Sequence, residues 1–125
     1  MDSMPALFYL ASFWAFARWR AGGSRARPLY ALSLGLINGD LFRRIAAFSP
    51  GFIVHSSHHG KPEVFVSHGT ADPILPIDRC SRVIVPALRR RGYEVTFREF
   101  EGGHEVPQEI AREAITWIAS AARQE

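Results

Sequence analysis

The sequence predicts an α/β protein in which a short parallel sheet is flanked by helices. Three short apolar runs, near Ile45, Val64 and Tyr93, are typical of strands, and stretches with helical spacing of apolar residues alternate with them. Strands that alternate with helices require right-handed crossovers and therefore a parallel sheet. The length of 125 residues and the hydrophobic content of 47% fit one globular domain with a single core.

The first two elements are a helix and a strand. The apolar, small-residue run 30–36 predicts a buried helix that ends near Asn38, where Gly39 is expected to take the left-handed conformation. Residues 45–48 form a short apolar run closed by the turn residues 49–51, which predicts the first strand.

The run 64–66 lacks alternation, which is typical of a central strand covered on both faces. A helix is predicted from Ile77, with Asp78 as its cap and Gly92 as its end. An interior proline removes a backbone donor, so Pro86 is expected to kink or split this helix.

The last strand and helix follow Gly92. Tyr93, Val95 and Phe97 alternate with polar residues, which predicts a strand with one partly wet face near the edge of the sheet. An apolar stripe then predicts a final helix, in which Trp117 belongs to the core. The residues of the stripe are Val106, Ile110, Ala114, Trp117, Ile118 and Ala121.

Charge and cysteine content exclude several classes of protein. The net charge is only +3, and the fourteen arginines are scattered along the chain, so we predict no nucleic-acid partner. The single cysteine, Cys80, cannot form an internal disulfide, which favours a cytoplasmic location. We expect Cys80 in the core and not as a nucleophile, because it lies within an apolar helical pattern.

The N-terminal region differs from the rest of the chain. Residues 4–17 are uncharged and apolar but too short to span a bilayer comfortably, and the arginines follow the run, unlike in a secretory signal. A loop rich in glycine and arginine, residues 21–28, comes next. We therefore divide the chain into an apolar arm and loop, 1–28, and a regular α/β region, 29–125.

The first candidate for chemistry is Asp72. It lies just beyond the carboxyl end of a buried strand, where open α/β sheets form their ligand sites. Gly69 is expected to allow a sharp turn there. The alternative is that Asp72 only forms a turn or caps a helix.

The second candidate is His104, which follows 32 residues later in the glycine-rich loop 101–107. Both loops follow strands, so they are expected to converge. A carboxylate that accepts a hydrogen bond from one imidazole nitrogen leaves the other nitrogen able to take a proton from a nucleophile. The alternative is a surface histidine without a catalytic role.

Other histidines support weaker hypotheses. A zinc site on His55, His58 and His59 with Glu63 is conceivable by spacing, but a polar loop is the commoner explanation. We therefore predict no metal and no cofactor. His68 is expected to be structural, at a strand end close to the candidate site.

The segments HGTADPILPID (68–78) and FREFEGGHEVP (97–107) resemble the acid and histidine segments of the phospholipase/carboxylesterase branch of the α/β-hydrolases. Residues 30–53 resemble the stretch that follows the nucleophile in that family. The resemblance implies the C-terminal half of an α/β-hydrolase fold, with Asp72 and His104 as two members of a catalytic triad. It also implies hydrolysis of carboxylic esters or thioesters through an acyl-serine, with a small-molecule ester as the expected substrate.

The nucleophile of that family is missing from the pattern. Its Gly-x-Ser-x-Gly motif should precede residue 30, but residues 21–28 read AGGSRARP. Ser24 lacks the second glycine, and Ser33 lies within the helical pattern. We expect a hydrolase that is truncated and inactive as it stands; the alternative is an interaction module that self-associates through an exposed sheet edge.

The loss of the family pattern near residue 28 suggests that residues 1–28 are not a homologous continuation. A truncated, rearranged or frame-shifted coding region would explain it. Translation of the neighbouring DNA in the other frames tests this hypothesis, because a Gly-x-Ser-x-Gly segment should then be found upstream.

Overall fold

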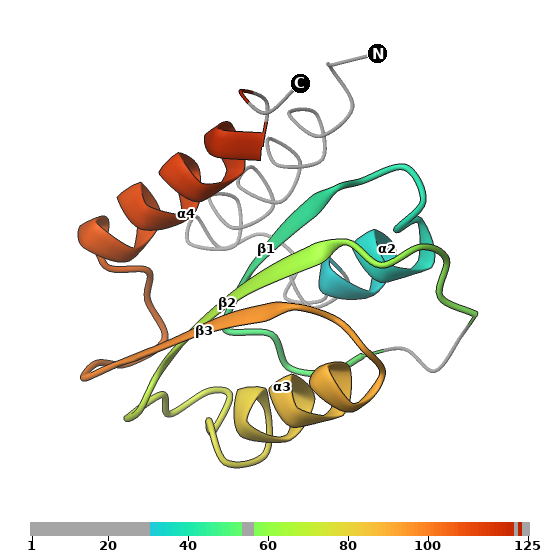
Figure 1. The fold of residues 1–125 in the computed structure, drawn as a ribbon. Helices are drawn as coiled ribbons and strands as arrows, with labels where there is room; N and C mark the ends of the chain where they lie inside the picture. Colours follow the sequence, from blue (N-terminus) through green and yellow to red (C-terminus); the bar gives the residue numbers. More distant parts are fainter. Residues whose placement is uncertain (1–30, 54–56, 122, 124–125) are drawn as a thin grey trace.

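The fold is built on a three-stranded parallel sheet whose middle strand pairs with both neighbours (Figure 1). A computed structural model describes residues 31–53, 57–121 and 123. The strands, in spatial order, are β1 (Arg44–Phe48), β2 (Glu63–Gly69) and β3 (Val95–Phe100). The predicted short parallel sheet is confirmed, with β2 at its centre.

The register of the sheet brings two strand ends together. Val64 pairs with Ile45 on one side and with Val95 on the other. Five residues further on, Gly69 at the end of β2 pairs with Phe100 at the end of β3. The loops that follow β2 and β3 therefore leave the same edge of the sheet at the same level.

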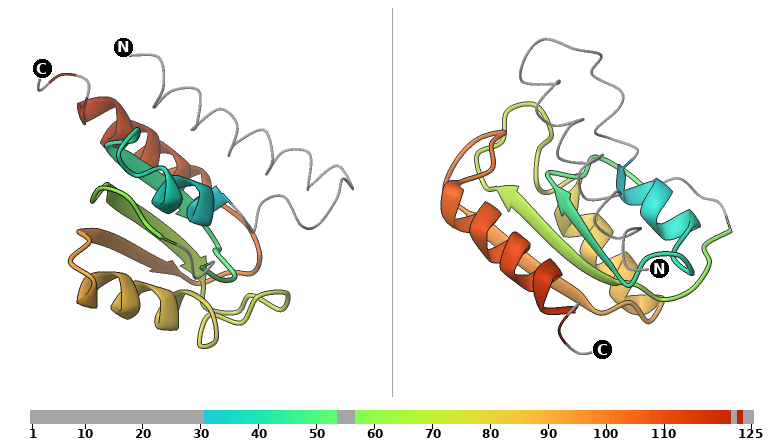
Figure 2. Two further views of the ribbon diagram at one scale, coloured as in Figure 1. Left: turned by 90° about the vertical axis from the view of Figure 1, so that its right-hand side faces the viewer. Right: turned by 90° about the horizontal axis from the view of Figure 1, so that it is seen from above.

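Helices cover both faces of the sheet, as predicted. The helices α2 (Ala31–Ile37) and α3 (Ser81–Arg90) pack on one face, and α4 (Gln108–Ala121) packs on the other. Figure 2 shows α3 and α4 on opposite sides of the sheet. No helix in the described part of the chain has the length and apolar character needed to cross a membrane.

Alternation along β2 divides the core between the two faces. Val64 and Val66 point toward α2 and α3, while Phe65 points toward α4. All three are fully buried, which explains why this strand reads as a continuous apolar run. Trp117 of α4 packs on Phe65 with ring centroids 5.7 Å apart, so its expected packing role is confirmed.

The larger cluster lies between the sheet and helices α2 and α3. Its buried members are Leu32, Leu36, Ile45, Ala47, Val64, Val66, Ile84, Val85, Leu88 and Tyr93.

Helix α3 differs from the sequence prediction in its first residue and in its cap. It begins at Ser81, after Cys80, and no side chain caps it; Asp78 binds Arg82 at 2.6 Å instead, so the predicted cap is wrong. Pro86 lies within the helix without splitting it. Because Pro86 is on the exposed side, water can satisfy the carbonyl that loses its donor.

Two glycines near the helix ends have different roles. Gly92 has φ of 87° and follows the C-cap residue Arg91, so it marks the end of α3 as predicted. Gly39 is not left-handed, so that expectation is wrong: the positive-φ glycines among the described residues are Gly60 and Gly92. A Cβ atom on Gly39 would lie 2.3 Å from the carbonyl oxygen of His59, so a close approach of two backbone segments requires glycine there.

Candidate active site

Asp72 lies in the loop that follows β2, and its side chain is buried. The residue is 5% exposed. Its Oδ1 accepts hydrogen bonds from the backbone N–H groups of Ile74 at 2.9 Å and Leu75 at 2.8 Å. An aspartate that binds the backbone two and three residues ahead stabilises its own turn. The turn role considered from the sequence is therefore present, and it leaves Oδ2 for a further partner.

That partner is His104, in the loop between β3 and α4. His104 Nδ1 lies 2.6 Å from Asp72 Oδ2, and the His104 side chain is 12% exposed. A carboxylate oxygen of an ionised aspartate only accepts hydrogen bonds, so Nδ1 carries the proton and donates it. The structure therefore brings together the two residues selected from the sequence.

Backbone contacts between the two loops explain this convergence. The N–H group of Thr70 donates to the carbonyl of Phe100 at 2.8 Å, and that of Ala71 donates to the carbonyl of Gly102 at 2.9 Å. The first bond continues the parallel pairing of β2 and β3, and the second extends it into the loops. The pairing thus ends one residue before Asp72.

Gly69 is required by this approach. A Cβ atom at this position would lie 2.2 Å from the carbonyl oxygen of Gly103 and 2.5 Å from that of Gly102. Gly69 is the last residue of β2, and the N–H group of Asp72 donates to its carbonyl at 3.3 Å, so the turn expected from the sequence begins here without a positive φ. The residue lacks a side chain because the histidine loop crosses directly over it.

The charge of Asp72 is stabilised where it is buried. Burial disfavours the carboxylate, but hydrogen bonds from Leu75, His104 and Ile74 outweigh that effect and hold the pKa of Asp72 below its ordinary value. The positive charge of a protonated His104 lowers it further. Asp72 is therefore ionised at neutral pH, as an acid that orients an imidazole must be.

His68 lies beside Asp72 and is fully buried, which confirms the expected structural position. Its Nδ1 is 2.6 Å from Ser81 Oγ, and its Nε2 is 2.7 Å from the carbonyl oxygen of Leu75. The same Nε2 is 3.3 Å from Asp72 Oδ2. The sequence indicated a residue near the site, but not this connection to the acid.

The arrangement has a defined chemical capacity. Asp72 fixes the tautomer of His104 by accepting from Nδ1, so Nε2 is the ring nitrogen that can exchange a proton with a reactant. When Nε2 takes a proton, the adjacent carboxylate stabilises the resulting imidazolium. This is the chemistry of a general base with an orienting acid.

The serines considered as nucleophiles do not complete the site. Ser24 lies outside the described residues. Ser33 is part of helix α2 and is only 1% exposed. Neither serine can be assigned as the nucleophile that His104 would activate.

Ser49 was missed by the sequence analysis, which treated it as a turn residue. It lies directly after β1, is 8% exposed, and has φ of 50°, which is unusual for a non-glycine residue. Its N–H group donates to the carbonyl of Ser67 at 2.8 Å. The next residue is Pro50, which has no N–H group, whereas a nucleophile elbow uses the following N–H group in its oxyanion hole.

Cys80 is also excluded as a nucleophile by its surroundings. It is 5% exposed, and burial together with the negative charge of Asp72 raises the pKa of its thiol. The reactive form of cysteine is the thiolate, which such an environment disfavours. The expected core position of Cys80 is confirmed.

The proposed zinc ligands do not assemble a site in the described part of the chain. His55 lies outside the described residues. Among the described residues, no group of three histidine, cysteine or acidic side chains is arranged to hold a metal ion, so His58, His59 and Glu63 form no such cluster.

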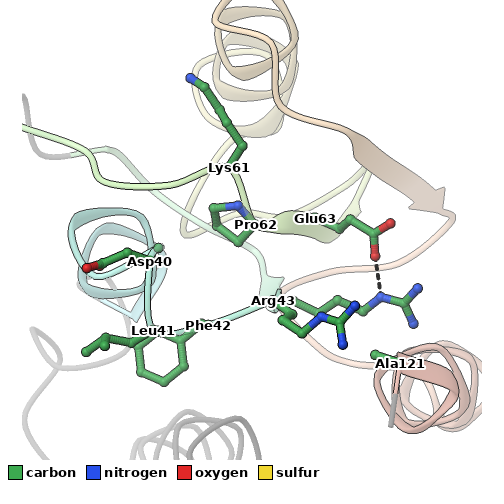
Figure 3. Close-up of a pocket in the computed structure, with 10 residues that line it drawn as sticks. Asp40, Leu41, Phe42, Arg43, Lys61, Pro62, Glu63 and Ala121 are labelled. Atoms are coloured by element: carbon green, nitrogen blue, oxygen red, sulfur yellow. Dashed lines mark hydrogen bonds and ion pairs between the residues drawn. The ribbon is translucent and has the colours of Figure 1, made fainter. Parts of the chain in front are cut away.

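A cavity of about 360 Å³ lies at the opposite end of the sheet, where β1 and β2 begin (Figure 3). Arg44 and Glu63 form an ion pair at this cavity. Figure 3 shows Lys61 pointing away from Glu63. Arg44 also binds the carbonyl of Trp117 and, at 2.7 Å, Ser120 Oγ. These contacts tie β1, β2 and α4 together, far from the strand ends that carry Asp72 and His104.

Comparison with solved structures finds the same fold in several proteins, two of which are named as an esterase and a carboxylesterase. Esterase PE8 has a TM-score of 0.66 at 23% identity, over 94% of this chain and 60% of that protein. A carboxylesterase from Bacillus cereus has a TM-score of 0.60 at 18% identity, over 90% of this chain and 58% of that one. SOBER1 from Arabidopsis thaliana has a TM-score of 0.60 at 16% identity, over 90% and 60%. No protein-family profile and no curated protein sequence matches this chain.

The observed fold and the comparisons show that this chain forms part of an α/β-hydrolase fold. Among its structural relatives are esterase PE8 and the carboxylesterase of Bacillus cereus, and this chain spans about 60% of the length of each. TM-scores of 0.60 to 0.66 at identities under 25% show a common fold and nothing beyond it. The resemblance found in the sequence is therefore confirmed at the level of the fold.

We predict that Gly69→Ala separates the two loops. The added methyl group would collide with backbone oxygens of Gly102 and Gly103, so the free energy of unfolding should fall by about 1–3 kcal/mol. Urea unfolding measures this loss. Gly103→Ala is the matched control, because its Cβ would lie at an ordinary 3.8 Å from Pro73. Equal stability of the two variants would contradict the close approach.

We also predict that Asp72 stabilises the fold in a pH-dependent way. The pKa of Asp72 is lower in the folded protein than the ordinary value of 3.8, so its contribution is complete above that value. It is lost as the pH falls below 3.8 and through the folded-state pKa. The free energies of unfolding of the wild type and of Asp72→Asn, measured in urea, should therefore converge as the pH falls.

The control for this pH series is Asp40→Asn, which removes one exposed carboxylate elsewhere. If the free energies of unfolding of wild type and Asp72→Asn differ by the same amount from pH 7 to below 3.8, the charge of Asp72 contributes nothing to stability.

Proposed function

We propose that Asp72 and His104 are the acid and the general base of a serine-type carboxylic ester hydrolase. The observation that carries the proposal is the 2.6 Å contact between His104 Nδ1 and the buried Asp72 Oδ2 at the carboxyl end of a parallel sheet. Open α/β sheets bind their ligands at this edge. The esterase and carboxylesterase structures with the same fold support the choice of ester substrates.

The proposed reaction is acyl transfer through a serine. His104 Nε2 removes the proton from the nucleophile hydroxyl as the oxygen attacks the ester carbonyl, and Asp72 stabilises the imidazolium that forms. The proton then passes to the leaving alcohol, and a water molecule releases the acid by the same steps. His104 and Asp72 supply the proton transfers of this sequence, and a hydroxyl nucleophile must come from elsewhere.

We propose that this chain lacks an efficient nucleophile of its own. Among the described serines considered, Ser33 lies inside a helix and Ser49 is followed by a proline. The family pattern before residue 30 is absent from the sequence. A substrate is proposed only as a small-molecule carboxylic ester, with a cytoplasmic location favoured by the single cysteine.

The second candidate function is an interaction module that associates with another copy of the chain through β1. In the described part of the chain β1 has a strand neighbour on one side only. At the other edge of the sheet, the carbonyl of Glu94 accepts from β2 and that of Phe100 accepts from Thr70, just after β2. Backbone groups of a strand alternate in direction, so those of Val95 and Phe97 face outward.

The outer edge of β3 is covered by arginine side chains. Arg89 donates to the Val95 carbonyl at 2.9 Å, and Arg98 donates to the Phe97 carbonyl at 3.4 Å. Charged side chains on an edge strand discourage pairing with another chain. This observation favours β1 as the edge for association.

The hydrolase proposal is tested by labelling with a fluorophosphonate, which reacts with activated serines. Should a nucleophile be present, mass spectrometry will find one labelled serine, and His104→Ala should slow labelling by about 10²–10⁴-fold. His59→Ala is the control, because this exposed histidine lies outside the site. Ser49→Ala tells whether the label is on the serine after β1.

Two results of the labelling experiment distinguish the hydrolase from the interaction module. Labelling that depends on His104 supports the hydrolase even if turnover is slow. Absence of labelling, together with no hydrolysis of activated esters, is the result expected of a chain without a nucleophile of its own; it contradicts an active hydrolase and favours the interaction module.

The interaction module is tested by sedimentation equilibrium. We predict a concentration-dependent dimer that Ala46→Pro weakens at least tenfold, because this proline removes a backbone N–H group on the outer edge of β1. Arg89→Ala, which uncovers β3, should leave the dimer unchanged. A monomer at all concentrations, or a dimer strengthened only by Arg89→Ala, would rule out association through β1.

A further inference from the structure

The surroundings of His68 suggest a role beyond filling space. The side chain is fully buried, yet both ring nitrogens have polar neighbours: Ser81 Oγ at 2.6 Å and the Leu75 carbonyl oxygen at 2.7 Å. Burying a polar ring is unfavourable unless it forms hydrogen bonds, and an apolar residue would fill this volume without that cost. The two short contacts therefore need an explanation.

The contacts determine which nitrogen of His68 carries the proton. A carbonyl oxygen only accepts, so Nε2 must donate to Leu75. The hydroxyl of Ser81 can then donate to Nδ1, and both nitrogens of a neutral ring are satisfied. Ser81 is the first residue of α3 and is itself fully buried, so it fixes the ring orientation from a rigid element.

Leu75 connects this ring to the catalytic acid. Its carbonyl accepts from His68, while its N–H group donates to Asp72 Oδ1 at 2.8 Å. His68 thus fixes the position of Leu75 by one hydrogen bond, and Leu75 fixes the position of Asp72 by another. In addition, His68 Nε2 lies 3.3 Å from Asp72 Oδ2, the oxygen that accepts from His104.

We infer that His68, oriented by Ser81, is a positioning residue that keeps Asp72 aimed at His104. The inference rests on the proposed function, because it assumes that the Asp72–His104 pair is the working part of the site. Oδ1 is held by two backbone donors, and Oδ2 lies between two imidazole rings. A carboxylate held at both oxygens cannot rotate away from His104 without breaking these contacts.

The experiment follows the proton on His104 Nδ1 by NMR, which needs neither a substrate nor a nucleophile. The resonance is assigned by its loss in Asp72→Asn. His68→Leu should speed exchange of this proton with water about tenfold or more, the change expected when a hydrogen bond to a charged group is weakened. His68→Gln, which can still donate to the Leu75 carbonyl, should restore slow exchange.

Ser81→Ala provides a second variant should His68→Leu fail to fold. It removes only the partner of His68 Nδ1 and should speed the same exchange. Ser67→Ala is the matched control, because this serine is equally buried but its Oγ has no hydrogen-bond partner in the structure. The control should leave exchange unchanged.

The results for the two proposals remain separable. Unchanged exchange in folded His68→Leu and Ser81→Ala would overturn the positioning role, whatever the labelling experiment gives. Loss of slow exchange in both, with rescue by His68→Gln, would support it even in a chain that no fluorophosphonate labels.

Discussion

The candidate site depends on the parallel pairing of β2 and β3 continuing past the ends of both strands. Gly69 pairs with Phe100, the next N–H group donates to Phe100 at the end of β3, and the one after it donates to Gly102 in the histidine loop. The two loops approach so closely that Gly69 has no room for a side chain. Two residues separated by 32 positions thereby come within hydrogen-bond distance, and the entropy of closing that segment is offset by a sheet that the core requires anyway.

Around this contact the protein has buried polar groups that satisfy one another. Asp72 accepts from two backbone N–H groups and from His104, and these bonds outweigh burial in setting its pKa. His68 and Ser81 continue the network into the core and toward α3. Buried polar groups weaken a fold when they lack partners and specify one arrangement when they have them. The rigidity of this network is what a base with an orienting acid needs.

The sequence predicted the helices and strands because their patterns are local. The continuous apolar run of β2 and the alternation before Phe100 identified a central and an edge strand. The errors concern details that depend on distant neighbours. Asp78 binds Arg82 and does not cap α3, and Gly39 is glycine because His59 approaches it. Neither neighbour can be recognised from residues adjacent in the sequence.

The sequence by itself determined the class of fold and selected Asp72 and His104, because strand ends and a glycine-rich loop are visible in the order of residues. Only the tertiary structure decided that the two side chains share a hydrogen bond and that His68 is bonded through Leu75 to the same acid. The physical reason is that hydrogen bonds depend on atomic positions to within a few tenths of an ångström. Such positions are set by the packing of β2, β3 and α3 together.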